Sequence, residues 1–200
     1  MNKKAKEKPH YVDNKKFLQA MIDWRETWPD ENNIPPVTDY IGECFLKIAT
    51  HLSYRPNFIN YTYRDEIISD GIENCLQYVK NFNPEKSKNP FAYFTQIIYY
   101  AFLRRIQKEK KQTHIKNKII EEIRKIYDPE LPVNIYELGL IYDIKVNGRK
   151  ADIKMTLTTP NCPVAESLPK EVKEGAMQVE GVDDVNLELV WDPPWNKDMM

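Results

Sequence analysis

The hydrophobic pattern of the chain changes period near residue 118, and this change constrains the fold more than any other feature. Before it, apolar residues recur three or four positions apart, which indicates amphipathic helices. After it, two segments at about 141–146 and 151–158 read as strands, and they flank Asn147-Gly148, a strong β-hairpin signal. We therefore predict a basic, mobile arm at 1–16 followed by two domains, an all-α domain at 17–118 and a small α+β domain at 119–200.

The charge is divided in the same way. Residues 1–118 hold 20 Lys/Arg and 14 Asp/Glu, whereas residues 119–200 hold 9 and 16, so the net charge of −1 conceals a basic and an acidic half. The apolar runs are too short for a membrane span, and the charged N-terminus is not a secretory signal. Three cysteines far apart in sequence exclude a disulfide scaffold and fit a reducing cytoplasm.

The helix predicted from Phe91 to about Lys111 carries aromatic and basic side chains at helical spacing on one face. They are Tyr93, Gln96, Tyr100 and Arg104, continued by Arg105 and Lys108. Cations neutralise phosphates, and rings stack on unpaired bases at about 1–3 kcal/mol each. A basic helix end also complements the helix dipole. The residues alone thus leave nucleic-acid binding and a solvated helix end equally open.

The preceding predicted helix has an acidic outer surface made of Asp65, Glu66, Asp70 and Glu73. Carboxylates in the first turn of a helix are ordinary, and Thr62 with Asp65 forms a capping-box pattern. The spacing fits neither a metal site nor a catalytic site. Capping is therefore the simpler interpretation of this surface.

Residues 10–118 resemble region two of bacterial sigma factors, and most of all the short sigma factors for late transcription of T-even-type phages. The stretch from Asn89-Pro90-Phe91-Ala92-Tyr93-Phe94 to Arg105 carries the resemblance. It implies binding to core RNA polymerase through Asp65, Glu66, Asp70 and Glu73, and melting of A/T-rich minus-ten promoter DNA. The implied contacts to flipped bases are Tyr93, Phe94, Gln96, Tyr99, Tyr100, Arg104 and Arg105, and we add Lys108 as a DNA contact.

In the second half, Cys162 stands between the end of a predicted strand and a helix expected to begin at Pro163. Amides at a helix N-terminus stabilise a thiolate and lower the pKa of a cysteine. A lone cysteine is also commonly a small buried hydrophobic residue. With no histidine or second cysteine nearby in sequence, both interpretations stay open.

Residues 119–200 resemble the SufT/PaaD-like iron–sulfur assembly domain through four ordered motifs. They are Asp128-Pro129-Glu130-Leu131, residues 134–141, residues 158–163 and Val190-Trp191-Asp192-Pro193-Pro194-Trp195. The resemblance implies a functional pocket made of Asp128, Glu130 and Cys162, in a factor that assists metalloprotein maturation and is not a conventional enzyme. One cysteine cannot hold a cluster, so we assign no cofactor except an iron–sulfur cluster held transiently with ligands from a dimer or partner.

Three functions follow from these two resemblances. The first is a phage late sigma factor with an appended assembly domain, acting in the bacterial host cytoplasm. The second is an iron–sulfur maturation factor whose helical half only tethers it to RNA polymerase, and the third is a fusion with an inert second domain. The expected partners are core RNA polymerase, promoter DNA, iron–sulfur assembly proteins and phage transcription co-activators, and no membrane is expected.

Overall fold

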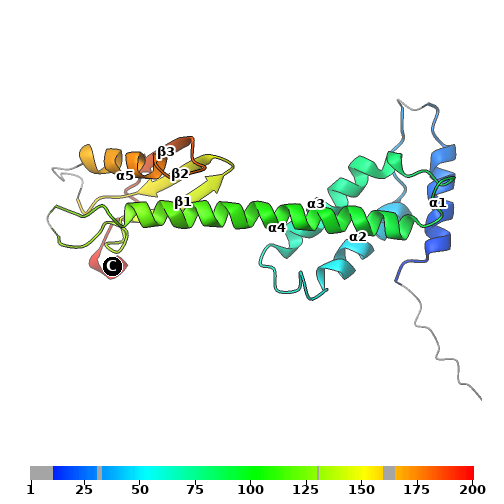
Figure 1. Cartoon of the computed structure of the whole chain (residues 1–200), viewed down its shortest axis with the longest axis horizontal. Coiled ribbons are helices and arrows are strands. Elements are labelled where there is room, and N and C mark those ends of the chain that lie inside the picture. The colour runs from blue at the N-terminus through cyan, green and yellow to red at the C-terminus, as the bar shows by residue number, and fades with distance from the viewer. Residues whose placement is uncertain (1–10, 31–32, 130, 160–164) are drawn as a thin grey trace, which may run out of the picture. The chain divides into compact units, whose positions relative to one another are not determined.

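The computed structural model describes residues 11–30, 33–129, 131–159 and 165–200. The chain divides into two compact units, residues 1–107 and 108–200. The elements assigned in the first unit are helical: α1 (Asn14–Glu26), α2 (Asp39–Ser53), α3 (Arg64–Tyr78), the short η1 (Val79–Asn81) and the first part of α4 (Pro90–Ile123) (Figure 1).

The first unit is closed around a core in which phenylalanine rings pack against one another. The rings of Phe45 and Phe94 lie 4.6 Å apart, Phe17 lies 5.7 Å from Phe94, and all three are fully buried. Burial of such side chains stabilises a fold by about 1.5–3 kcal/mol each. This core orients α4 so that the neighbouring helical positions face outward.

Side-chain caps define where α1 and α4 begin. Asp13 accepts hydrogen bonds from the backbone of Lys15 and Lys16, and Asn89 accepts one from Ala92 at 3.0 Å. Pro90 opens α4 as expected, because its missing N–H is not needed in the first turn. The predicted capping box at the start of α3 is wrong: its N-cap is Tyr63, without a side-chain hydrogen bond.

The helix α4 continues beyond the residue where the sequence pattern predicted its end. The predicted end is near Lys111, whereas Pro90–Ile123 is one continuous helix. The reason is that no glycine or proline interrupts this stretch, and lysine, glutamine and glutamate are good helix formers. The limit between the two compact units thus falls inside a helix.

The second unit combines a three-stranded sheet with helices. After the end of α4 come β1 (Ile141–Asn147), β2 (Lys150–Met155), α5 (Ser167–Met177), β3 (Asp184–Leu189) and the short η2 (Lys197–Met199). The strand order is β1-β2-β3, with β1 and β2 antiparallel and β2 and β3 parallel. The predicted hairpin is confirmed, with Gly148 at φ +66°, in the left-handed region that glycine tolerates.

One side of the sheet packs on helices. Ile119 and Ile123 of α4, Val172 and Ala176 of α5, and Ile153 of β2 are buried in a common core. Figure 1 shows α5 beside the sheet, and it contacts β3.

Polar side chains pair along the β2–β3 ladder. Lys150 pairs with Asp184, Asn186 donates to Asp152, and Lys154 pairs with Glu188. Each pair joins residues that lie opposite each other in the parallel register. We call these six residues the polar ladder.

Candidate functional site

The residues that we expected to contact bases line a pocket on the first unit. The pocket has a volume of about 320 Å³ and is formed by Tyr78, Tyr93, Gln96, Ile97, Tyr100 and Arg104. Four of these were predicted from one face of α4, and the structure brings them together. We call it the α4 pocket.

The walls of the α4 pocket offer rings and one guanidinium. The side chain of Tyr100 is 51% exposed, and the ring of Tyr93 packs at a tilt on the buried ring of Phe82, with 5.3 Å between the ring centres. Burial raises the pKa of Tyr93, and the neighbouring Cys75 raises it further, so its hydroxyl stays protonated. Arg104 donates to the Asn74 side chain at 2.6 Å, which holds the guanidinium at the rim. Such a pocket suits a flat aromatic group joined to an anion.

Sequence reasoning missed Tyr78 and Ile97 as pocket residues. Ile97 follows Gln96 directly and has no aromatic or charged group that would mark it as a base contact. Tyr78 belongs to α3, so its place beside α4 depends on how the two helices pack. The spacing of residues along α4 therefore could not identify Tyr78 as a pocket residue.

Two of the predicted DNA contacts have other roles. The prediction for Phe94 is wrong, because its ring is fully buried against Phe17, Phe45 and Phe82 and cannot reach a base. Arg105 is half-buried and lies 3.3 Å from Asp70 in an ion pair between α4 and α3. Tyr99 packs on Phe58 and Tyr100 and does not line the pocket, and Lys108 is exposed further along α4.

The acidic surface of α3 is partly used inside the fold. Asp65, Glu66 and Glu73 are exposed, whereas Asp70 is the partner of Arg105. Three carboxylates of the four thus remain at the surface as a candidate docking face.

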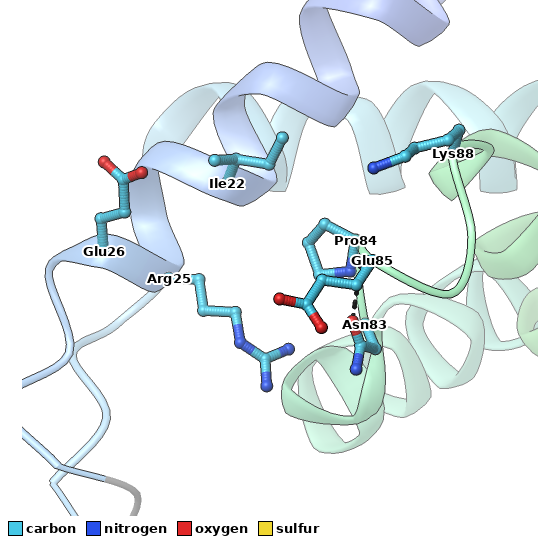
Figure 2. Close-up of a pocket in the computed structure, with 7 residues that line it drawn as sticks. All are labelled: Ile22, Arg25, Glu26, Asn83, Pro84, Glu85 and Lys88. Atoms are coloured by element: carbon cyan, nitrogen blue, oxygen red, sulfur yellow. Dashed lines mark hydrogen bonds between the residues drawn. The ribbon is translucent and has the colours of Figure 1, made fainter.

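A second cavity of the first unit, of about 360 Å³, lies between α1 and the loop before α4 (Figure 2). Arg25 donates from α1 to the Phe82 carbonyl at 2.8 Å, and the Glu85 backbone N–H donates to Asn83. Figure 2 shows Lys88 and Glu85 directed into the same space. None of these residues stood out in the sequence, and their mixed charge gives no preference for an anion.

In the second unit, Asp128 organises the turn that follows α4. Its backbone N–H donates to the Val133 carbonyl at 3.1 Å, and its carboxylate accepts from the Leu131 N–H at 3.0 Å. Asn134 closes the next turn by accepting from Glu137 at 2.9 Å. Asp128 is almost fully buried, so its carboxylate is held in one orientation.

Glu130 and Cys162, the other two predicted pocket residues, lie outside the described residues. Within the ranges that the structure describes, His, Cys, Asp and Glu side chains do not gather in threes as a metal site would require. Cys44 and Cys75 are buried in the first unit, and burial raises the pKa of both thiols. They are therefore poor ligands, since metals bind the thiolate.

The C-terminal tail is fastened to the start of β1. The indole of Trp195 donates to the Leu138 carbonyl at 2.8 Å, and the Tyr142 hydroxyl donates to the Pro193 carbonyl at 2.7 Å. Gly139, at φ +75°, touches the backbone of Met199, where a Cβ would lie 2.9 Å from the Met199 carbonyl carbon. The last residues of the predicted motif 190–195 thus belong to a docked strap, residues 193–199.

Among the residues with described structure, no helix combines the length and apolar character that a membrane crossing requires.

The comparisons with known proteins concern the second unit. The family model described as iron–sulfur cluster assembly protein matches residues 116–189. The Fe-S protein maturation auxiliary factor of Porphyromonas gingivalis is 46% identical over 83 residues, which are 41% of this chain and 79% of that protein. The Fe-S protein maturation auxiliary factor SufT of Staphylococcus aureus is 37% identical over 76 residues, which are 38% of this chain and 86% of that protein.

An iron–sulfur cluster carrier protein of Deinococcus radiodurans is 34% identical over 71 residues, 36% of this chain but only 20% of that longer protein. The residues that the family model matches include the first three of the four motifs of the second unit and end before the fourth. Through this unit, the chain belongs to the iron–sulfur cluster assembly protein family.

Proposed function

We propose that the chain is an iron–sulfur protein maturation factor that handles a cluster as cargo at Cys162, with Asp128 and Glu130 beside it. The observation that carries this proposal is the 46% identity to a maturation auxiliary factor, which extends over most of that protein. The buried, hydrogen-bonded carboxylate of Asp128 supports it, because a fixed carboxylate can orient a partner group.

The small number of available cysteines supports transient binding of a cluster. Iron–sulfur clusters are commonly held by four thiolates. Because Cys44 and Cys75 are buried in the first unit, Cys162 is the remaining thiol of this chain. Further ligands then come from another protein or a second copy, which fits a factor that passes a cluster on and does not store it.

The test is complementation of a bacterial strain that lacks its own maturation auxiliary factor. The Cys162→Ala variant is expected to lose recovery of iron–sulfur enzyme activity, while Cys44→Ala, a thiol removal in the other unit, retains it. Equal recovery of enzyme activity by the wild-type chain and by Cys162→Ala would show that maturation does not depend on Cys162. Abundance of each variant is measured by immunoblotting, so that loss of protein is not mistaken for loss of function.

The α4 pocket favours a second function for the first unit, namely binding of core RNA polymerase and of single-stranded promoter DNA. Tyr93, Gln96, Tyr100 and Arg104 were expected to contact unpaired bases, and all four line the α4 pocket. The exposed acids Asp65, Glu66 and Glu73 supply the proposed polymerase contact.

Transcription in vitro with core RNA polymerase on A/T-rich promoter templates tests this second function. Tyr100→Ala with Arg104→Ala is expected to abolish promoter opening and to leave polymerase binding intact. Asp65→Lys with Glu66→Lys is expected to weaken polymerase binding, and it spares the Asp70–Arg105 ion pair. A wild-type chain that binds the polymerase but never opens a promoter would mean that the helical half acts only as a tether.

A further inference from the structure

The connection between α2 and α3 is a compact loop whose ends meet. The guanidinium carbon of Arg64 lies 3.6 Å from the ring centre of Tyr54, and the Arg64 Nε donates to the Ser53 hydroxyl at 3.0 Å. A loop of 6–16 residues with adjoining ends and its own packed side chains is an Ω-loop, a type that often carries function. We call residues 54–64 the Ω-loop.

The Ω-loop is held in one conformation. The Arg55 carbonyl accepts from the backbone N–H groups of Phe58 at 2.8 Å and Ile59 at 2.9 Å. The Phe58 ring is buried and packs edgewise on Tyr99 at 5.8 Å and Phe102 at 5.2 Å. A fixed surface loses little conformational entropy when a partner binds.

This fixed loop exposes apolar side chains. Tyr54 is 54% exposed, Ile59 is 48% exposed and Tyr63 is 44% exposed, although Phe58 shows that the loop can bury a ring. Exposed apolar side chains that gather in one place mark interaction sites, and tyrosine and arginine are the residues that contribute most at protein interfaces. The stacked pair of Tyr54 and Arg64 presents both types together.

The charges of the loop and of the residues after it balance. Arg55 is exposed and Arg64 stacks on Tyr54, while the exposed Asp65 and Glu66 follow the loop directly. A surface without net positive charge has little attraction for the phosphates of a nucleic acid. The exposed apolar side chains therefore favour a protein partner, whose basic side chains can pair with Asp65 and Glu66.

We propose that the Ω-loop is a protein-docking surface, with Tyr54 and Ile59 at its centre and Asp65 and Glu66 at its rim. The partner it fits is a protein surface with an apolar depression flanked by lysine or arginine. This inference rests on the proposed binding of the first unit to core RNA polymerase, and it assigns most of the binding energy to the loop and less to the acids.

The test measures the affinity of immobilised core RNA polymerase for the full-length chain by biolayer interferometry. Tyr54→Ala and Ile59→Ala are each expected to weaken binding at least about tenfold, because truncation of a central interface residue has an effect of this size. Tyr127→Ala is the matched control, since Tyr127 is 60% exposed in the second unit. Thermal melting by circular dichroism shows whether each variant is folded, and Ile59→Ala leaves the Tyr54–Arg64 stack in place.

The outcomes separate the two claims. If the wild-type chain binds and both loop variants bind within twofold of it, the docking surface is refuted and polymerase binding stands. If the wild-type chain does not bind core polymerase, both are refuted. If the loop variants instead lose affinity for a single-stranded oligonucleotide and keep their affinity for the polymerase, the partner is a nucleic acid and the inference is wrong.

Discussion

Replacement of Gly139 by alanine tests whether the C-terminal strap is docked as described. Gly139 adopts φ +75° and touches the backbone of Met199, whereas Gly148 adopts φ +66° with open space where a Cβ would lie. Both alanine variants therefore incur the conformational cost of the left-handed region, about 1–2 kcal/mol. Only Gly139→Ala also drives a methyl group into the strap.

The extra cost in Gly139→Ala is limited by what the strap contributes. The cheapest response is release of residues 193–199, which gives up the hydrogen bonds from Trp195 to Leu138 and from Tyr142 to Pro193. At roughly 1 kcal/mol for each bond, the two variants should differ by about 2 kcal/mol. That difference corresponds to an approximately 30-fold change in the equilibrium constant for unfolding.

Hydrogen–deuterium exchange in peptides covering β1 and β2 reports the stability of the second unit by itself. Exchange should be faster in Gly139→Ala than in Gly148→Ala, and the indole N–H resonance of Trp195 should shift toward that of a solvated tryptophan in Gly139→Ala alone. Equal exchange rates and an unmoved indole signal in the two variants would refute the docked strap.

Two further predictions concern the first unit. Asn14 caps the start of α4, because its side chain accepts from the Phe91 N–H at 3.1 Å and donates to the Lys88 carbonyl at 3.2 Å. Asn14→Ala should lower the free energy of unfolding, measured by urea denaturation, by about 0.5–2 kcal/mol. A free energy of unfolding equal to that of the exposed control Asn117→Ala would contradict the cap. Burial raises the pKa of Cys75 above its ordinary value of 9.0, so the unfolded chain releases this proton first and stability should fall as the pH rises above about 9. Cys75→Ala should flatten this decline, and an unchanged slope would argue against burial of the thiol.

Much of the second unit could be predicted because its signals are local. Alternating strands and an Asn-Gly turn specify a hairpin without reference to distant residues, and the observed strands match the prediction within a few positions. The continuity of α4 could not be read from the same pattern. A cluster of lysines suggests a loop between two helices. The structure has one unbroken helix there, because no glycine or proline interrupts the stretch.

The residues of the candidate site also differ in how far the sequence alone predicts their positions. Tyr93, Gln96, Tyr100 and Arg104 share one face of a single helix, so helical spacing alone brings them together. The burial of Phe94 and the pairing of Arg105 with Asp70 depend on how α1, α2 and α3 pack against α4. No spacing rule within α4 holds that information.

The polar ladder has a consequence for how the sheet avoids mispairing. Asp152 lies opposite Asn186, and Asp184 and Glu188 stand two residues to either side of that asparagine. A slip of two residues keeps every side chain on its proper face, yet in either direction it sets Asp152 against a carboxylate. Exposed ion pairs add little to stability, so the main effect of the polar ladder is to disfavour wrong alignments of the strands. Asp152 therefore favours one alignment of the two parallel strands. In that alignment it faces the neutral Asn186, whereas a slip of two residues in either direction would place it opposite another carboxylate.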